Sequence, residues 1–256
     1  MSRVLLATLF LLLALPGCSR NDPLEQTLAK LQPGAPFPAA DLLPAPLRDA
    51  AWTVGRVHKV SSDLPMSEGG SWCSAYTTVL RSETRPAHNV MAVFCGGKRR
   101  TFAPDAAFFT SPTASGDPKG QGRFEATFVD ALEPGREIVW HSERSLDPQG
   151  FLTIRERAWR ERDGKLEQIL DTTPVDPALA KTKLAQGRRQ FLEAQNTYAP
   201  GFTGSHPKQF VYRGKFSGRP FVRSLDYTEA TGYRGGPTLP GPSPTPPVGL
   251  DGGSSD

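Results

Sequence analysis

The sequence predicts a mainly β protein whose antiparallel strands form a curved sheet or a partly closed barrel, together with one amphipathic helix. Three observations support this fold class. Many short segments alternate apolar and polar residues with a period of two, turn-forming residues separate these segments, and one later segment has helical spacing. An α+β fold is the alternative that the same pattern allows.

The N-terminus has the pattern of a signal peptide over residues 1–17. Arg3 precedes an apolar run over residues 4–15, which is shorter than the roughly 20 apolar residues of a membrane-spanning helix. The run ends at Leu15-Pro16-Gly17-Cys18, which resembles the lipobox of bacterial lipoproteins. The resemblance implies cleavage before Cys18, acylation of its thiol and anchoring to the membrane through the acyl chains. In that family, Ser19 at the next position implies sorting to the outer membrane, on the side facing the periplasm.

Residues 18–51 are rich in Pro and Ala and contain one short helix. Asp22 is placed as its N-cap and Pro23 as its first helical residue, and Pro33-Gly34 ends it. Closely spaced prolines then exclude long regular elements. We expect this segment to be a tether that packs partly on the domain and holds it away from the lipid surface.

Residues 52–234 are predicted to form a single β-rich domain. Alternation begins at Trp52 and predicts a first strand over 52–60. The best hairpin signal is Asp163-Gly164, because that dipeptide suits a two-residue turn with positive φ angles. The further strands are expected at residues 72–81, 89–95, 99–102, 123–129, 137–142, 151–161, 165–171, 209–215 and 220–227.

One segment of this domain has helical periodicity. Asp176-Pro177 begins it and Pro200-Gly201 ends it, so the helix is predicted over residues 176–198. Its apolar residues fall on a narrow stripe that would cover one face of a sheet. Residues 235–256 contain six Pro and six Gly and are predicted to form a disordered tail.

Two cysteines remain after Cys18, and we predict a disulfide between them. Such pairs form in oxidising compartments, which include the bacterial periplasm. If residues 72–81 and 89–95 make a hairpin centred on Thr84, Cys73 and Cys95 lie directly opposite each other. A redox-active pair or two metal ligands are the alternatives. The spacing is not C-x-x-C, and no histidine lies within a few residues of either cysteine.

No catalytic or metal-binding pattern stands out in the sequence. The four histidines are scattered, and there is neither a G-x-S-x-G nucleophile elbow nor a glycine-rich phosphate loop. We therefore predict no catalytic residues, no cofactor and no metal site. His141 follows Trp140 in a predicted strand, where a histidine is usually structural.

The segment over residues 155–162, Arg-Glu-Arg-Ala-Trp-Arg-Glu-Arg, is the most highly charged of the predicted strands. We expect a solvated strand with cross-strand ion pairs, which contribute little to stability when exposed. The same strand is the candidate ligand-binding site. It would present Trp159, flanked by Arg157 and Arg160, to an acidic or glycan ligand.

The leading functional prediction is a lipid-anchored envelope lipoprotein that acts as a non-enzymatic binding, assembly or scaffold component. Its expected partners are the membrane and an envelope protein or peptidoglycan. The net charge is +4, falling to +3 when Arg3 is removed with the signal, and no basic stripe is present, so we predict no nucleic-acid partner. A carrier of an apolar ligand, resembling in outline the lipoprotein-insertion factors, and an envelope hydrolase are the alternatives.

Overall fold

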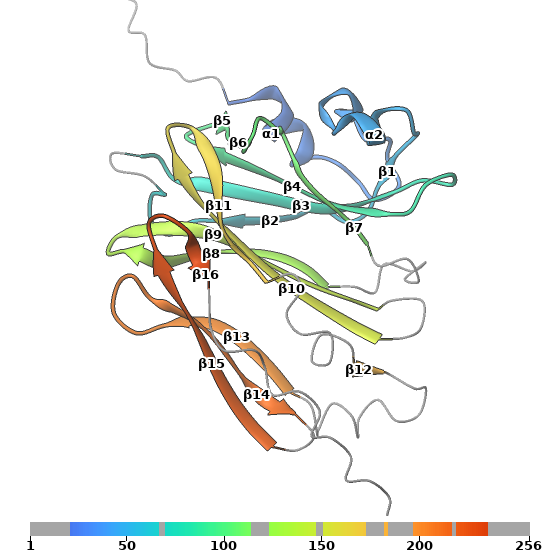
Figure 1. The fold of residues 1–256 in the computed structure, drawn as a ribbon. Coiled ribbons are helices and arrows are strands. Elements are labelled where there is room, and N and C mark those ends of the chain that lie inside the picture. The colour runs from blue at the N-terminus through green and yellow to red at the C-terminus, as the bar shows by residue number, and fades with distance from the viewer. Residues whose placement is uncertain are drawn as a thin grey trace, which may run out of the picture.

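A computed structural model describes residues 21–66, 70–113, 123–146, 151–172, 182–183, 197–216 and 219–234. These residues form three β-sheets and a few short helices near the N-terminus (Figure 1). All strand pairs are antiparallel except one short parallel pair, and none of the described sheets closes on itself. The predicted mainly β, antiparallel and curved architecture is confirmed.

The N-terminal segment forms a layer of short helices. Helix α1 spans Pro23–Leu28, a 3-10 turn spans Ala40–Leu42 and α2 spans Ala45–Arg48. As predicted, Asp22 caps α1, because its carboxylate accepts a hydrogen bond from the Leu24 N–H at 2.9 Å. Buried residues of this layer, including Leu43 and Leu47, pack against the first sheet, so the segment contributes to a core.

The first sheet is centred on a long hairpin. Its strands are β1 (Thr53–Val54), β2 (His58–Ser61), β3 (Cys73–Arg81), β4 (His88–Cys95), β5 (Lys98–Arg99) and β7 (Phe109–Pro112). Cys73 faces Cys95 in the β3–β4 register, as the hairpin centred on Thr84 predicts. The strand expected over 52–60 is broken in two, since residues 55–57 leave the ladder between β1 and β2.

The middle sheet carries the longest strands of the described chain. They are β6 (Thr101–Phe102), β8 (Arg123–Glu133), β9 (Arg136–Leu146), β10 (Phe151–Arg162), β11 (Lys165–Asp171) and β12 (Thr182–Lys183). The β10–β11 turn has φ angles of 52° at Asp163 and 81° at Gly164, which confirms the predicted hairpin and its turn chemistry.

The third sheet has the order β13-β14-β15-β16. These strands span Thr197–Thr203, Gln209–Phe216, Arg219–Thr228 and Gly232–Arg234. The helix predicted over 176–198 lies mostly outside the described residues. Within that range, Thr182–Lys183 form β12 beside β10, and Thr197 and Tyr198 begin β13. Residues 1–17, Cys18 and the tail over 235–256 also lie outside the described residues.

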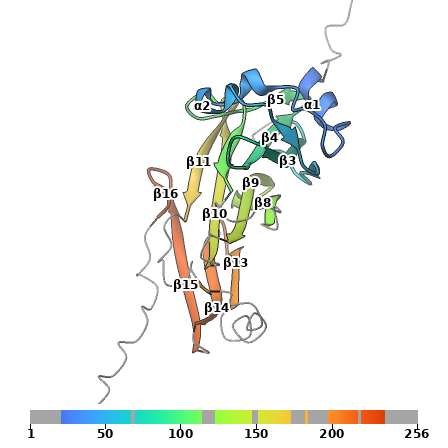
Figure 2. The same cartoon turned by 90° about the vertical axis from the view of Figure 1, so that its right-hand side faces the viewer.

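The layers are stacked in chain order, with the N-terminal helices at one end and the third sheet at the other (Figure 2). Alternate residues of β3 and β4 serve different cores: Tyr76 and Phe94 face the helices, whereas Ala75 and Val93 face the middle sheet. A third core joins the middle and third sheets around Phe210. The middle sheet is therefore covered on both faces.

Candidate functional site

A charged cleft of about 660 Å³ opens where three hairpins come together. These are the β8–β9, β10–β11 and β15–β16 hairpins, and each contributes charged side chains close to its turn. The described lining residues are Met66, Leu132, Glu133, Arg136, Glu137, Ile138, Arg160, Glu161, Arg162, Asp163, Pro207, Tyr227 and Glu229.

Tight turns and one close backbone contact give the cleft its shape. Gly135, Gly164 and Gly232 have φ angles of 78°, 81° and 68°, a region that favours glycine. Gly232 also lies against β11: a Cβ atom at this position would be 2.3 Å from the Ile169 carbonyl oxygen. This contact holds β16 on the middle sheet and places the β15–β16 hairpin beside the β10–β11 hairpin.

An ionic network centred on Glu229 forms one wall. Arg160 donates to the Glu229 carboxylate at 2.6 Å and to the Tyr227 hydroxyl oxygen at 2.5 Å, and Tyr227 itself donates to Glu229 at 2.6 Å. Arg162 also donates to Glu229, and Arg160 donates to Glu167 at 3.0 Å. The wall is a closed set of charge-assisted hydrogen bonds.

These contacts fix the protonation states of two acidic groups. The hydrogen bonds from Tyr227 and Arg160 lower the pKa of Glu229 to about 2. Burial and the hydrogen bond to Glu229 raise the pKa of Tyr227 to about 12. At neutral pH, the wall therefore presents an ionised carboxylate, a protonated phenol and two guanidinium groups.

The remaining carboxylates of the cleft are held in different ways. Glu137 is buried and accepts hydrogen bonds from the backbone N–H groups of Asp63 and Leu64 at 3.0 and 3.1 Å. Glu161 accepts from the Gly164 N–H at 2.8 Å and lies 3.5 Å from Arg100 Nε. Asp163, at the tip of the β10–β11 hairpin, is exposed.

Carboxylates outnumber guanidinium groups among the described residues that line the cleft. The described lining has five carboxylates, on Glu133, Glu137, Glu161, Asp163 and Glu229, and three guanidinium groups, on Arg136, Arg160 and Arg162, an excess of two negative charges. It includes no Ser, Cys or His. A site of this composition attracts a ligand that carries basic groups and hydrogen-bond donors.

The structure separates the three residues predicted to bind a ligand. Arg160 lines the cleft. Arg157 and Trp159 point to the opposite face of β10, into the space between the first and middle sheets, where they are 2% and 3% exposed. The prediction that residues 155–162 form a solvated strand is wrong for its centre, because the middle sheet is covered on both faces and Glu156 and Arg157 are fully buried.

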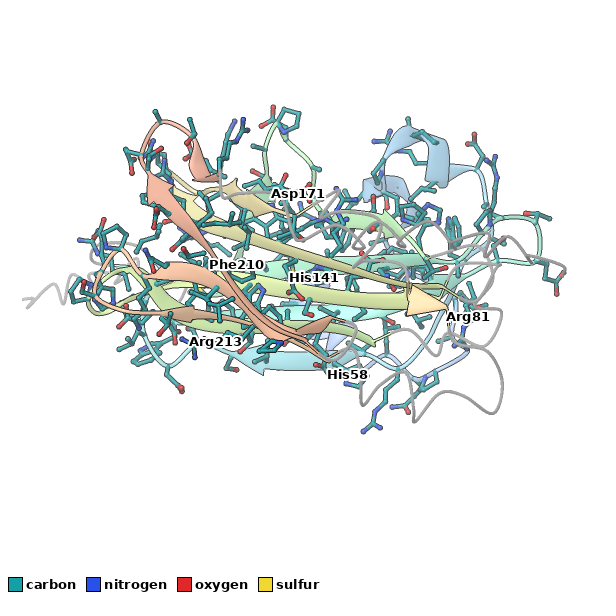
Figure 3. All side chains as sticks on the ribbon, turned by 60° about the horizontal axis from the view of Figure 1, so that its bottom comes forward. His58, Arg81, His141, Asp171, Phe210 and Arg213 are labelled. Atoms are coloured by element: carbon teal, nitrogen blue, oxygen red, sulfur yellow. A yellow bond between two sulfur atoms is a disulfide. The ribbon has the colours of Figure 1, made fainter. Side chains whose placement is uncertain are left out.

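A buried polar cluster surrounds Arg157. Glu143 accepts hydrogen bonds from Arg157 at 3.0 Å, from Asn89 at 3.0 Å and from Ser111 at 3.1 Å, so it joins the middle sheet to the first. His141 lies beside this cluster on β9 (Figure 3), packed against Phe124, and neither ring nitrogen has a hydrogen-bond partner among the described residues. The side chains of this cluster are all buried.

The cysteines and histidines build no metal centre in the part of the chain that the structure describes. The Cys73 and Cys95 sulfur atoms are 2.06 Å apart, the separation of a disulfide. His206 pairs with Asp130 at 2.7 Å. No described helix has the length and apolar character needed to span a membrane.

Sequence patterns do not identify most of the cleft. Tyr227 and Glu229 come from a hairpin more than 60 residues after Arg160, as the separation of 67 between Arg160 and Tyr227 shows. The sequence does show charged residues beside two turns, at Glu133-Pro134-Gly135-Arg136 and at Arg162-Asp163-Gly164. That signal marks which turns carry charge, but it does not show which turns meet.

Comparison of the chain with protein-family models, curated proteins and solved structures finds no match.

Proposed function

We propose that the chain is a lipid-anchored cell-envelope lipoprotein that acts as a non-enzymatic binding or assembly component. Its binding site is the charged cleft, and its ligand is a basic segment of an envelope protein. The observation that carries the binding role is the cleft itself, with its prearranged ionic wall and its excess of carboxylates. The anchoring role is supported by the sequence Leu15-Pro16-Gly17-Cys18.

The cleft has the size and order expected of a binding site. A volume of about 660 Å³ lies within the range of ligand pockets, roughly 300–1,000 Å³. Arg160, Tyr227 and Glu229 hold one another in place before any ligand arrives, so binding need not order these side chains. The wall can therefore recognise charge and geometry at low entropic cost.

The packing of the first sheet gives less support to an apolar-ligand carrier. The apolar space between α1 and the first sheet, lined by residues that include Leu28, Phe37 and Phe108, holds about 10 Å³. That volume accommodates no more than about one water molecule. In the described part of this core, side chains already occupy the room that an acyl chain would need.

The anchoring is tested by mass spectrometry of the protein from bacterial membranes and by Cys18→Ser. We expect a diacylglyceryl group on an N-terminal Cys18 in the native protein, and we expect the Cys18→Ser chain to lack both the acyl group and cleavage before residue 18. A mature protein that begins after residue 18, or a native Cys18 without an acyl group, would contradict the proposal.

The binding role is tested by photocrosslinking in living cells. A photoreactive residue replaces Glu133 at the rim of the cleft, and a second chain carries it at the exposed Glu83 on the β3–β4 connection. We expect a defined protein adduct from position 133 and none of the same mass from position 83. Adding Asp163→Lys should reduce the position-133 adduct several-fold, whereas Glu83→Lys, the same charge change away from the cleft, should leave it unchanged.

Two outcomes would overturn the binding proposal. One is an adduct from position 133 that is insensitive to Asp163→Lys. The other is an adduct that disappears on digestion of peptidoglycan, which would make the ligand a component of the cell wall.

A further inference from the structure

The folded body begins almost at the proposed anchor. The Asp22 N–H donates to the Gly97 carbonyl oxygen at 2.7 Å, in the turn between β4 and β5. Asn21 packs on the same turn so closely that a Cβ at Gly97 would lie 2.4 Å from the Asn21 Oδ1. The segment that was expected to be a tether packing partly on the domain therefore contacts the first sheet from residue 21.

The covalent chain limits how far this turn can be from the lipid. Cys18 precedes Asp22 by four residues, and an extended chain spans at most about 3.6 Å per residue, so the two residues are within ~14 Å of each other. Acyl chains on Cys18 would lie in the bilayer. The β4–β5 turn would then be held at the surface of the membrane.

This end of the molecule carries an exposed tryptophan. Trp72 is 62% exposed, and its carbonyl oxygen accepts a hydrogen bond from the Gly96 N–H at 3.0 Å, next to the turn that holds Asp22. Tryptophan is enriched at the interface between membrane and water, because its ring is apolar while its N–H remains hydrogen-bonded.

Basic residues lie beside the same turn. Lys98 follows Gly97 directly and is exposed, and Arg99 is partly exposed. Among the described residues, neither side chain makes an ion pair. Cations placed this close to the lipid are attracted by anionic headgroups.

We propose that Trp72, the Gly96-Gly97 turn and Lys98 form a membrane-docking surface, whose partner is the anionic phospholipid bilayer that holds the chain's own anchor. This inference rests on the proposed acylation of Cys18. The protein then lies directly on the bilayer, with Trp72 inserted among the headgroups. The third sheet is at the opposite end of the stack and faces away from the lipid (Figures 1 and 2).

The test uses the full lipidated chain in vesicles of phosphatidylethanolamine and phosphatidylglycerol, with and without bromine on the acyl chains. Bromine quenches tryptophan fluorescence at close range. The chain has four tryptophans, so the difference between the native chain and Trp72→Phe isolates the Trp72 signal. We expect most of that signal to be lost in brominated vesicles and its emission in plain vesicles to shift to shorter wavelength.

A tryptophan at the opposite end provides the matched control. Val222 on β15 is 69% exposed, so Val222→Trp in the Trp72→Phe background places the same probe on the third sheet. Its emission should be equal in plain and brominated vesicles. Lys98→Glu should reduce quenching of Trp72, and Lys98→Arg should preserve it.

Flotation of the vesicles separates failure of this inference from failure of the anchoring. A chain that floats with the vesicles but shows no quenching of Trp72, or equal quenching of Trp72 and of a tryptophan at 222, overturns the docking surface and leaves the anchor intact. A chain that does not float overturns the anchoring and the docking surface together.

Discussion

Arg157 is a buried charged residue of the middle sheet, and it forms an ion pair with Glu143. Its guanidinium lies 3.0 Å from Glu143 and 4.8 Å above the ring of Phe109. Burial lowers the pKa of Arg157, and the Glu143 carboxylate opposes that shift. Breaking such a pair strands one charge away from water, which costs far more than breaking an exposed pair.

Arg157→Ala is expected to lower the free energy of unfolding by about 3–5 kcal/mol. Arg155, two residues away, pairs with Asp171 where both side chains are about one-third exposed, 32% and 31%. Arg155→Ala should therefore change the unfolding free energy by no more than ~1 kcal/mol. Urea denaturation of both variants checks the contrast, and similar losses would show that Arg157 is not effectively buried.

A double variant isolates the effect of the Glu143 charge that is left without its partner. Glu143→Gln keeps an oxygen that can accept from Asn89 and Ser111 but removes the negative charge. In the Arg157→Met background it should restore part of the lost stability. No restoration would mean that packing around Arg157, and not the charge of Glu143, dominates the loss.

His141 makes stability depend on pH. Burial, followed by the positive charges of Arg157 and Arg155, lowers the pKa of His141 well below its ordinary value of 6.5. The unfolded chain therefore takes up this proton at a higher pH than the folded chain does. The contribution of neutral His141 to the free energy of unfolding is fully present above pH 6.5. As the pH falls below 6.5, the free energy of unfolding decreases by up to ~1.4 kcal/mol per pH unit.

His141→Leu should remove this part of the pH dependence. The variant also eliminates two buried ring nitrogens that lack partners in the described part of the chain, so its unfolding free energy at neutral pH should be within about 1 kcal/mol of the native value or above it. Urea denaturation between neutral pH and pH 5 (about 1.5 units below 6.5) measures both effects. His58→Gln, at an exposed strand position, serves as the control and should retain the native slope.

Within single hairpins, Gly164 and Gly232 have similar positive φ angles. Substituting each of them distinguishes the cost of backbone strain from the cost of a steric clash. Gly164 has a φ of 81°, and a Cβ atom there would meet nothing within 4 Å, whereas a Cβ at Gly232 would be 2.3 Å from the Ile169 oxygen. Gly164 lies in the turn of the β10–β11 hairpin, and Gly232 is the first residue of β16 in the β15–β16 hairpin. Both hairpins line the cleft. A difference between their alanine variants therefore reports the contact between β16 and β11.

Gly164→Ala is expected to cost about 1 kcal/mol, from the positive φ angle. Gly232→Ala should cost that amount plus about 1–3 kcal/mol for displacing β16 from β11. Thermal unfolding monitored by circular dichroism gives the comparison. Equal destabilisation by the two substitutions would show that β16 moves away at little cost.

Hairpins were the elements that the sequence predicted best. The β3–β4 register followed from the symmetry of residues 73 and 95 about Thr84, and the β10–β11 turn followed from Asp163-Gly164. Both signals are local, because the turn residues and the alternation occur within one short segment. The break at residues 55–57 was not predicted, since alternation continues through that stretch.

At the scale of the whole molecule, the cleft and the buried cluster depend on how the three sheets pack against one another. The sequence did not predict that packing. Alternation shows that Arg157 and Arg160 point to opposite faces of β10, but it does not show that both faces are covered. The centre of β10 is covered on both faces because the middle sheet lies between the first and third sheets. Most strands of those two sheets are far from β10 in the sequence. A strand with four arginines in eight residues, 155–162, looks solvated by composition, yet its centre lies in the interior.

A cavity in one of the stacked cores should destabilise mainly the sheets that line that core. Phe210 is fully buried between the middle and third sheets, and Phe94 is 1% exposed between the first sheet and the helices. Each alanine substitution should cost about 3–5 kcal/mol. Hydrogen exchange followed by mass spectrometry should show faster exchange mainly in β13–β16 for Phe210→Ala and mainly in β3 and β4 for Phe94→Ala. Uniform acceleration in both variants would show that the three sheets open as one unit.

The burial of both faces of β10 also governs how that strand finds its alignment. A slip of one residue turns every side chain to the other face. In a sheet with one wet face, water can solvate a misplaced charge, but the central residues of β10, 156–159, are buried on both faces. Correct alignment matches Arg157 with Glu143, while the nearest wrong alignment would drive the guanidinium towards the aromatic contact between the middle and third sheets. A one-residue slip would therefore separate Arg157 from Glu143 and leave both charges buried without each other, so the pair favours the native alignment of β10.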